Sequence, residues 1–181
     1  MLILASASPR RHELLLAAGI AHVVRPSHIP EDRHPDESPS GYVCRIAACK
    51  VGTIAVADSD VVLGADTVVC VEGEVLEKPR DDRDAARMLN LLSGREHRVL
   101  TGIALRKGER LIHDLAETKV WFDEIAPDEI AEYIRTGEAN DKAGAYAIQG
   151  YASRFVRRIE GSYHNVVGLP VSLVYRHLKE L

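Results

Sequence analysis

The sequence is short of cysteine, of long apolar runs and of positive charge. Its three cysteines, Cys44, Cys49 and Cys70, lack CxxC spacing, which argues against a disulfide framework or a zinc site and suits a reducing cytoplasm. We expect neither a signal peptide nor a membrane span, because the apolar N-terminus is only a few residues long and has no basic region before it. A net charge of −4 with no basic face disfavours nucleic acid and anionic membranes as partners.

What is present is the composition of a globular α/β protein. With 181 residues and 46% hydrophobic content, the chain predicts one domain over residues 1–181, with room for two lobes. Strand and helix patterns alternate early, and a long hairpin is expected from Glu96 to Ile125, which together favour a mixed sheet. The other predicted elements are strands at 2–5, 21–27, 60–71, 75–76 and 155–159, helices at 9–18, 41–57, 82–92, 127–136 and 170–181, and loops at 28–40 and 160–170.

The segment Leu2 to Gly19 predicts a strand, a turn and a helix that together can bind an anion. Ser8 is a candidate N-cap and Pro9 suits the first helical position. Unpaired N–H groups and the helix dipole would then face a ligand beside Ser6 and Ser8, with Arg10 and Arg11 adding charge. The alternative is an ordinary first strand and helix with surface arginines.

Three charged residues further along the chain have both a functional and a structural interpretation. Asp66 interrupts a valine-rich strand, so we expect it at a strand end or bulge, facing a cation or water, as a catalytic or metal-binding group rather than a structural cap. Lys50 falls on the apolar stripe of a helix, where it either snorkels past the core or meets a phosphate. Glu31 is either a metal or water ligand or a solvated loop residue.

The second half of the chain offers fewer candidates. Lys78, fixed before Pro79, is either delivered to a ligand or a simple loop lysine. The segment Asp141 to Tyr151 is rich in small residues that let a backbone approach a ligand, and it carries Gln149. His164 and Asn165 are expected to form structural hydrogen bonds, because no GxSxG nucleophile motif accompanies them.

These pieces favour polyphosphate hydrolysis over other chemistry. GxGxxG, the Walker lysine loop and HExxH are all absent, which removes the main support for dinucleotide, P-loop and zinc-protease readings. Cations can neutralise phosphates while a carboxylate holds a divalent metal or orients water. An unperturbed aspartate, with a pKa of roughly 3.9, would be a poor base, so we expect Asp66 to act largely through a bound metal.

Seven segments, in order and spacing, resemble those of the Maf family of nucleoside triphosphate pyrophosphatases. They are ASASPRRHELL, YVCRIAACK, LGADTVV, LEKPRD, LSGREHRVLTG, DKAGAYAIQG and EGSYHNVVGLP. The resemblance implies cleavage between the α- and β-phosphates of surplus or non-standard triphosphates with Mg²⁺, or Mn²⁺ in its place, as house-cleaning of nucleotide pools in the cytoplasm. It also implies a fold similar to the inosine triphosphate pyrophosphatases, with two lobes around a deep cleft on an elongated sheet, and it leaves room for a homodimer.

The resemblance assigns roles to particular positions. Asp66 matches the proposed general base; Arg10, Thr67 and Gln149 match specificity residues; Ser6, Ser8, Arg11, Lys50 and Lys78 match positions around the triphosphate. Asp66 and Glu31 are the candidate metal ligands, although His28 and Pro30 stand where relatives commonly have acidic residues before Glu31. Relatives usually have glycine where Ala147 stands, and an alanine there would be strained if that position required a positive φ.

The AYAIQG segment resembles the type that acts on dTTP and UTP. A glutamine amide offers both an acceptor and donors, which match the edge of uracil and thymine. Two alternatives remain: a nucleotide-binding regulator of cell division and septum formation with little catalysis, and the same hydrolysis acting on a modified purine such as 7-methyl-GTP.

Overall fold

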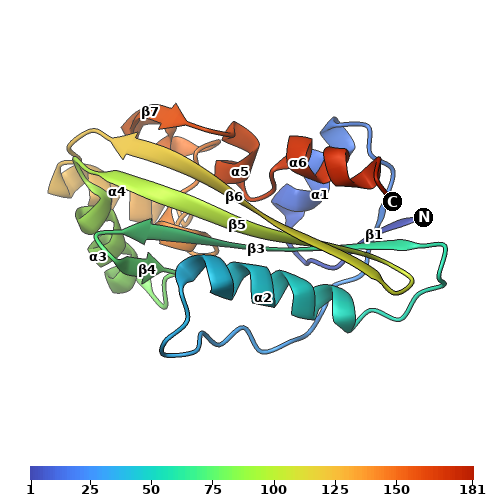
Figure 1. Cartoon of the computed structure of the whole chain (residues 1–181). Coiled ribbons are helices and arrows are strands. Elements are labelled where there is room, and N and C mark those ends of the chain that lie inside the picture. The colour runs from blue at the N-terminus through green and yellow to red at the C-terminus, as the bar shows by residue number, and fades with distance from the viewer. The chain divides into compact units, whose positions relative to one another are not determined.

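A computed structural model describes residues 1–181 (Figure 1). None of its helices has the length and apolar character needed to cross a membrane. In chain order the elements are β1 (Leu2–Leu4), α1 (Pro9–Ala17), β2 (Val23–Val24), α2 (Pro39–Gly52), β3 (Val61–Val71), β4 (Glu74–Leu76), α3 (Asp82–Leu92), β5 (Glu96–Lys107), β6 (Arg110–Phe122), α4 (Pro127–Arg135), the short 3₁₀ turns η1 (Ala143–Ala145) and η2 (Tyr151–Phe155), β7 (Val156–Glu160), α5 (Tyr163–Val167) and α6 (Val171–Leu178).

Seven strands form one mixed sheet in the order β2-β1-β3-β5-β6-β7, with β4 paired to β3. Strand β1 is parallel to both β2 and β3, whereas β4 is antiparallel to β3 and β7 is antiparallel to β6. Strands β5 and β6 are neighbours joined by two residues, which makes them a hairpin. The predicted α/β fold with a mixed sheet is therefore confirmed.

The contacts within the chain divide it into two compact units. The first comprises residues 1–67, 100–116 and 168–181, and the second comprises residues 68–99 and 117–167. Two units agree with the two lobes that the resemblance implies. The deep cleft and the single domain over residues 1–181 stay predictions.

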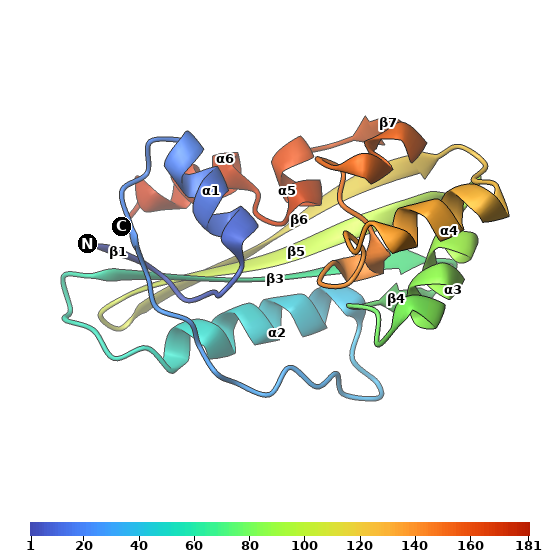
Figure 2. The same cartoon turned by 180° about the vertical axis from the view of Figure 1, so that it is seen from behind.

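In the first unit, α2 lies along one side of β3, and α1 and α6 lie on the other side (Figures 1 and 2). Two glycines allow the helix to come this close. A Cβ at Gly64 of β3 would lie 2.5 Å from the carbonyl oxygen of Ala47, and one at Gly102 of β5 would lie 2.5 Å from that of Val43. Because the side chains are missing here, α2 approaches the sheet and brings Lys50 beside β3.

Several element boundaries differ from the prediction. Helix α2 begins at Pro39, since the Ser38 hydroxyl accepts a hydrogen bond from the backbone N–H of Gly41 at 3.1 Å and caps it, and the helix ends at Gly52 rather than near Ala57. The expected strand at 21–27 shortens to β2, and the expected loop at 160–170 contains α5. Helix α3, with Asp81 as its cap, occupies its predicted range.

Candidate active site

Asp66 lies in the middle of β3, with both neighbours inside the strand. The expectation of a strand end or bulge is wrong, but the expected cation is there: Lys50 Nζ donates to Asp66 Oδ1 at 2.8 Å. Asp66 is 7% exposed, and its other oxygen, Oδ2, has no hydrogen-bond partner in the protein and is not sealed from solvent. The arrangement presents one free carboxylate oxygen to a ligand or to water.

Lys50 Nζ has three oxygen partners. Besides Asp66, it donates to the carbonyl oxygen of Ala65 at 3.2 Å and pairs with Glu31 Oε1 at 2.9 Å. The Lys50 side chain is 6% exposed, whereas that of Glu31 is 45% exposed. Lys50 therefore does not snorkel, and a phosphate oxygen would reach it most easily by replacing the Glu31 carboxylate.

Arg11 is buried and makes four hydrogen bonds. Its guanidinium donates to Ser6 Oγ at 3.0 Å and to the carbonyl oxygen of Ala65 at 2.8 Å. It also donates to Thr67 Oγ1 at 3.1 Å and to the carbonyl oxygen of Gly168 at 2.9 Å. Arg11 and Lys50 thus share the carbonyl that precedes Asp66, so both cations are held beside the residue next to that carboxylate.

Burial and charge act on Asp66 in opposite directions. Burial raises the pKa of Asp66 above its usual value, while the Lys50 ammonium and the Arg11 guanidinium oppose the rise. The net shift is upward, which makes Asp66 a stronger base than the unperturbed aspartate that the sequence suggested. The sequence-based expectation of an unperturbed aspartate is therefore corrected, because Asp66 lies on a covered strand where burial raises its pKa.

The N-terminus of α1 differs from its prediction in one detail. Ser8 occupies the N-cap position and Pro9 the first helical position, as expected, but the Ser8 hydroxyl makes no capping hydrogen bond. The backbone N–H of Ser8 instead donates to Ser6 Oγ at 3.2 Å. No side-chain hydrogen bond caps the first turn of α1, which is where the sequence predicts the anion. Arg10 follows in that turn and is half-buried.

Asp66 and Glu31 are the acidic residues that the sequence predicts as metal ligands. No group of three or more His, Cys, Asp or Glu side chains is placed to hold a metal ion. Mg²⁺ commonly binds through one or two carboxylates and completes its shell with water and substrate phosphates. Asp66 and Glu31, which both contact Lys50, supply two oxygen donors of that kind.

The second unit holds the remaining predicted residues, Lys78 and Gln149, and both are exposed. Their segments lie side by side, because the backbone N–H of Gly144 donates to the carbonyl oxygen of Glu77 at 3.1 Å. Ala147 does not have a positive φ, so the anticipated strain is not there; the left-handed conformation falls on Ala145 instead, with φ of 60°.

Sequence reasoning missed the residues that hold the Gln149 segment. Glu138 accepts hydrogen bonds from the Tyr133 hydroxyl at 3.1 Å and from the Tyr151 backbone N–H at 3.0 Å. In the same unit the buried His97 Nε2 lies 2.8 Å from the Tyr146 hydroxyl. The Glu138–Tyr151 and His97–Tyr146 contacts have no local sequence signal, since their partners are 13 and 49 residues apart in the chain.

The expectation of structural hydrogen bonds is consistent with the structure for Asn165, while that for His164 stays a prediction. Asn165 is fully buried, and its Nδ2 donates to the carbonyl oxygen of Val99 and to Thr118 Oγ1, each at 3.0 Å. His164 is exposed. These hydrogen bonds give Asn165 a structural part.

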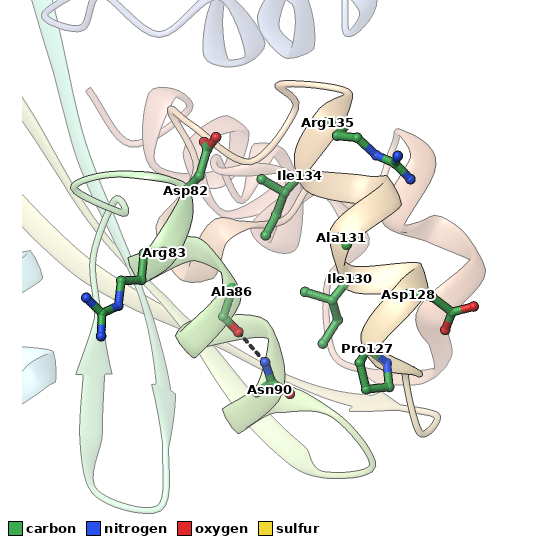
Figure 3. A pocket seen from close by; sticks show the side chains of 10 residues that line it. All are labelled: Asp82, Arg83, Ala86, Asn90, Pro127, Asp128, Ile130, Ala131, Ile134 and Arg135. Carbon is green, nitrogen blue, oxygen red and sulfur yellow. Dashed lines mark hydrogen bonds between the residues drawn. The ribbon is translucent and has the colours of Figure 1, made fainter.

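A separate groove of about 520 Å³ lies between α3 and α4 (Figure 3). Its floor is formed by Ala86, Ile130 and Ile134, and charged residues, among them Asp82 and Arg135, stand at its rim. The groove contains none of the residues predicted from the sequence.

The chain is similar to several known proteins. A dTTP/UTP pyrophosphatase of Koribacter versatilis (strain Ellin345) is 50% identical over 179 residues, covering 98% of this chain and 93% of that protein. One of the same name from Geobacillus sp. (strain WCH70) is 48% identical over 183 residues, covering 99% and 97%. A crystal structure of a nucleoside-triphosphatase / dITP/XTP pyrophosphatase from Mycobacterium abscessus aligns over 98% of this chain and 93% of its own, with 15% identity and a TM-score of 0.45. The model of the Maf family, described as Maf-like protein, matches residues 1–181, and the chain belongs to that family.

Proposed function

We propose that this protein hydrolyses dTTP and UTP to their monophosphates and pyrophosphate. The relatives that carry this activity in their names are about half identical to the chain over nearly its whole length. The observation that carries the proposal is the buried carboxylate of Asp66, which accepts a hydrogen bond from Lys50 at one oxygen and has no protein partner at the other, while Arg11 binds the carbonyl just before it. The modified-purine alternative has no feature of this site in its favour.

Asp66 acts as the base in this proposal. Water attacks phosphorus, its proton passes to Asp66 Oδ2, and the bond between the α- and β-phosphates breaks to release pyrophosphate. Burial raises the pKa of Asp66 above its usual value, which makes the carboxylate a better proton acceptor than an exposed aspartate. Lys50, Arg11 and the first turn of α1, with Ser6, Ser8 and Arg10 beside it, face the negative charge that develops on the phosphates.

Asp66 and Glu31 would hold Mg²⁺, or Mn²⁺, together with the substrate phosphates. When bound, the ion neutralises phosphate charge and acidifies water. Glu31 is paired with Lys50, so a phosphate that takes over Lys50 releases Glu31 for this role.

Gln149 is the proposed base-reading residue, and Lys78, on a neighbouring segment of the same unit, a further phosphate contact. The amide of Gln149 can pair with the donor and acceptors of uracil and thymine. It makes no contact with the ring 5-position, where the two bases differ. Thr67, the third specificity residue by resemblance, adjoins Asp66 on β3. Action in the cytoplasm, as house-cleaning of nucleotide pools, is part of the same proposal; a homodimer stays a prediction.

A side-by-side panel of triphosphates tests the proposal. Wild-type protein and Asp66→Asn are incubated with dTTP, UTP, CTP, GTP and 7-methyl-GTP in the presence of MgCl₂, and pyrophosphate is measured. We expect the wild type to release pyrophosphate faster from dTTP and UTP than from CTP, GTP and 7-methyl-GTP, and Asp66→Asn to release it from none of them at a comparable rate. Binding of nucleotide without turnover would favour the regulator of cell division, and preference for 7-methyl-GTP would favour the purine enzyme.

A further inference from the structure

Thr67 is the centre of a hydrogen-bond network that lies entirely within the first unit. Its Oγ1 receives a hydrogen bond from Arg11 Nη2 at 3.1 Å and lies 2.9 Å from Thr101 Oγ1. It also donates to the carbonyl oxygen of Gly168 at 3.4 Å. The network joins residues of α1, β3 and β5 to the segment before α6.

The direction of the bond between the two threonines follows from the surroundings of Thr101. Thr101 is 0% exposed, and Thr67 is the one partner of its hydroxyl. A buried hydroxyl proton without an acceptor is costly, so Thr101 donates to Thr67. Thr67 then accepts two hydrogen bonds, from Arg11 and Thr101, and gives its single proton to Gly168.

A threonine hydroxyl has one donor and two acceptor sites. All three are occupied in Thr67, so its hydroxyl cannot bind a nucleotide base without breaking a bond inside the protein. The charged partner in the network is the Arg11 guanidinium, which commits four N–H groups to protein oxygens and keeps one of its Nη2 hydrogens. The hydrogen bonds of this network that involve a charged group are therefore those that hold Arg11.

We propose that Thr67 and Thr101 are positioning residues that fix the Arg11 guanidinium for the phosphate chain and do not read the base. This inference rests on the proposed function and deepens it. Removing the Thr101 hydroxyl takes away one of the three hydrogen bonds that hold Thr67 Oγ1, which loosens the acceptor of Arg11 Nη2. Because Arg11 also donates to the carbonyl oxygen of Ala65, the disturbance reaches the residue next to Asp66.

The test compares Thr67→Val and Thr101→Val, which remove a hydroxyl at nearly constant volume, with Thr101→Ser, which keeps it. Thr118→Val is the matched control, since Thr118 is as buried as Thr101 and its hydroxyl makes three hydrogen bonds, but it lies in the second unit. Steady-state kinetics with UTP and CTP give kcat/KM for two bases that present different edges. Calorimetric titration with sodium tripolyphosphate in MgCl₂ measures binding of a phosphate chain that has no base, and thermal unfolding reports the fold.

We expect Thr67→Val and Thr101→Val to lose roughly tenfold in kcat/KM for UTP and CTP alike and in tripolyphosphate affinity, as expected for a hydrogen bond to a charged group. Thr101→Ser and Thr118→Val should retain wild-type values. A changed UTP-to-CTP ratio, or unchanged tripolyphosphate affinity in folded Thr101→Val, overturns the inference. If the wild type hydrolyses no triphosphate, the proposed function fails, and the tripolyphosphate titration still decides the role of the threonines.

Discussion

The buried pair of His97 and Tyr146 should make the stability of this protein depend on pH in a way that one substitution removes. His97 is 1% exposed on β5, and its Nε2 lies 2.8 Å from the Tyr146 hydroxyl, while its Nδ1 has no partner. No acidic group faces the ring, and burial lowers the pKa of His97 to about 3. The imidazole is therefore neutral in the folded protein at any pH near neutrality.

The sign and size of the effect follow from linkage. The unfolded chain takes up a proton at His97 below its ordinary pKa of 6.5, whereas the folded chain does so only near 3. The contribution of His97 to the free energy of unfolding is therefore fully present above its pKa in the unfolded chain, and it declines as pH falls toward 3. About pH 5 is about 1.5 units below the pKa of His97 in the unfolded chain, so the free energy of unfolding there is ~2 kcal/mol lower than above that pKa. For a chain of this length that corresponds to roughly 4–8 °C in melting temperature.

Melting temperatures of the wild type and His97→Gln between about pH 7.5 and pH 5 check this reasoning. Over this pH range the melting temperature of the wild type should fall by roughly 4–8 °C more than that of His97→Gln, which has no titrating side chain at position 97. Parallel curves for the two proteins would refute the burial of a neutral His97. Tyr146→Phe keeps the pH dependence but leaves Nε2 unpaired, which should cost about 1–3 kcal/mol at every pH. Because Tyr146 anchors the segment of Gln149, this variant should also raise KM for UTP.

Three further substitutions test other contacts. Asp66→Asn should lower kcat for UTP by roughly a hundred- to ten-thousandfold, as loss of a general base does, with a melting temperature no lower than wild type, because burial opposes the ionised carboxylate; unimpaired turnover would contradict the assignment. Gly150→Ala would place a Cβ 2.0 Å from Glu138 Oε2, so urea titration should show a loss of about 1–3 kcal/mol and kinetics a higher KM for UTP; wild-type values in both would refute the close approach. The hydrogen bond to Asp114 raises the pKa of His177 in the folded protein. The pair therefore stabilises the fold fully below the unfolded pKa of 6.5, and this stabilisation is lost as pH rises through the raised pKa of the folded state. His177→Gln should lower the melting temperature more at about pH 6 than at about pH 9, and an equal loss at both would exclude the ion pair.

Local patterns predicted the elements that place the active site. The valine-rich strand with Asp66, the stripe that carries Lys50 and the Pro9 start of α1 all depend on neighbours within a few residues, which sequence periodicity records. The unlikely position of an aspartate in an apolar strand was itself informative. Its cation partner on α2 could be anticipated in type, since a buried carboxylate needs compensation.

Contacts between distant residues could not be predicted in this way. Arg11 and Gly168 are separated by 157 positions, and Thr67 and Thr101 by 34. A single threonine in the run VLTGIAL carries no sign of its partner, because the partner is fixed by strand register and helix packing. For the same reason the raised pKa of Asp66 emerged only with the burial that produces it.

The most direct test of the central claim is the ³¹P NMR spectrum of UTP during incubation with the protein and MgCl₂. The account predicts that UMP and pyrophosphate appear together in equal amounts with the wild type, and that neither appears at a comparable rate with Asp66→Asn. Formation of UDP and inorganic phosphate, or equal production of UMP by both proteins, would contradict it.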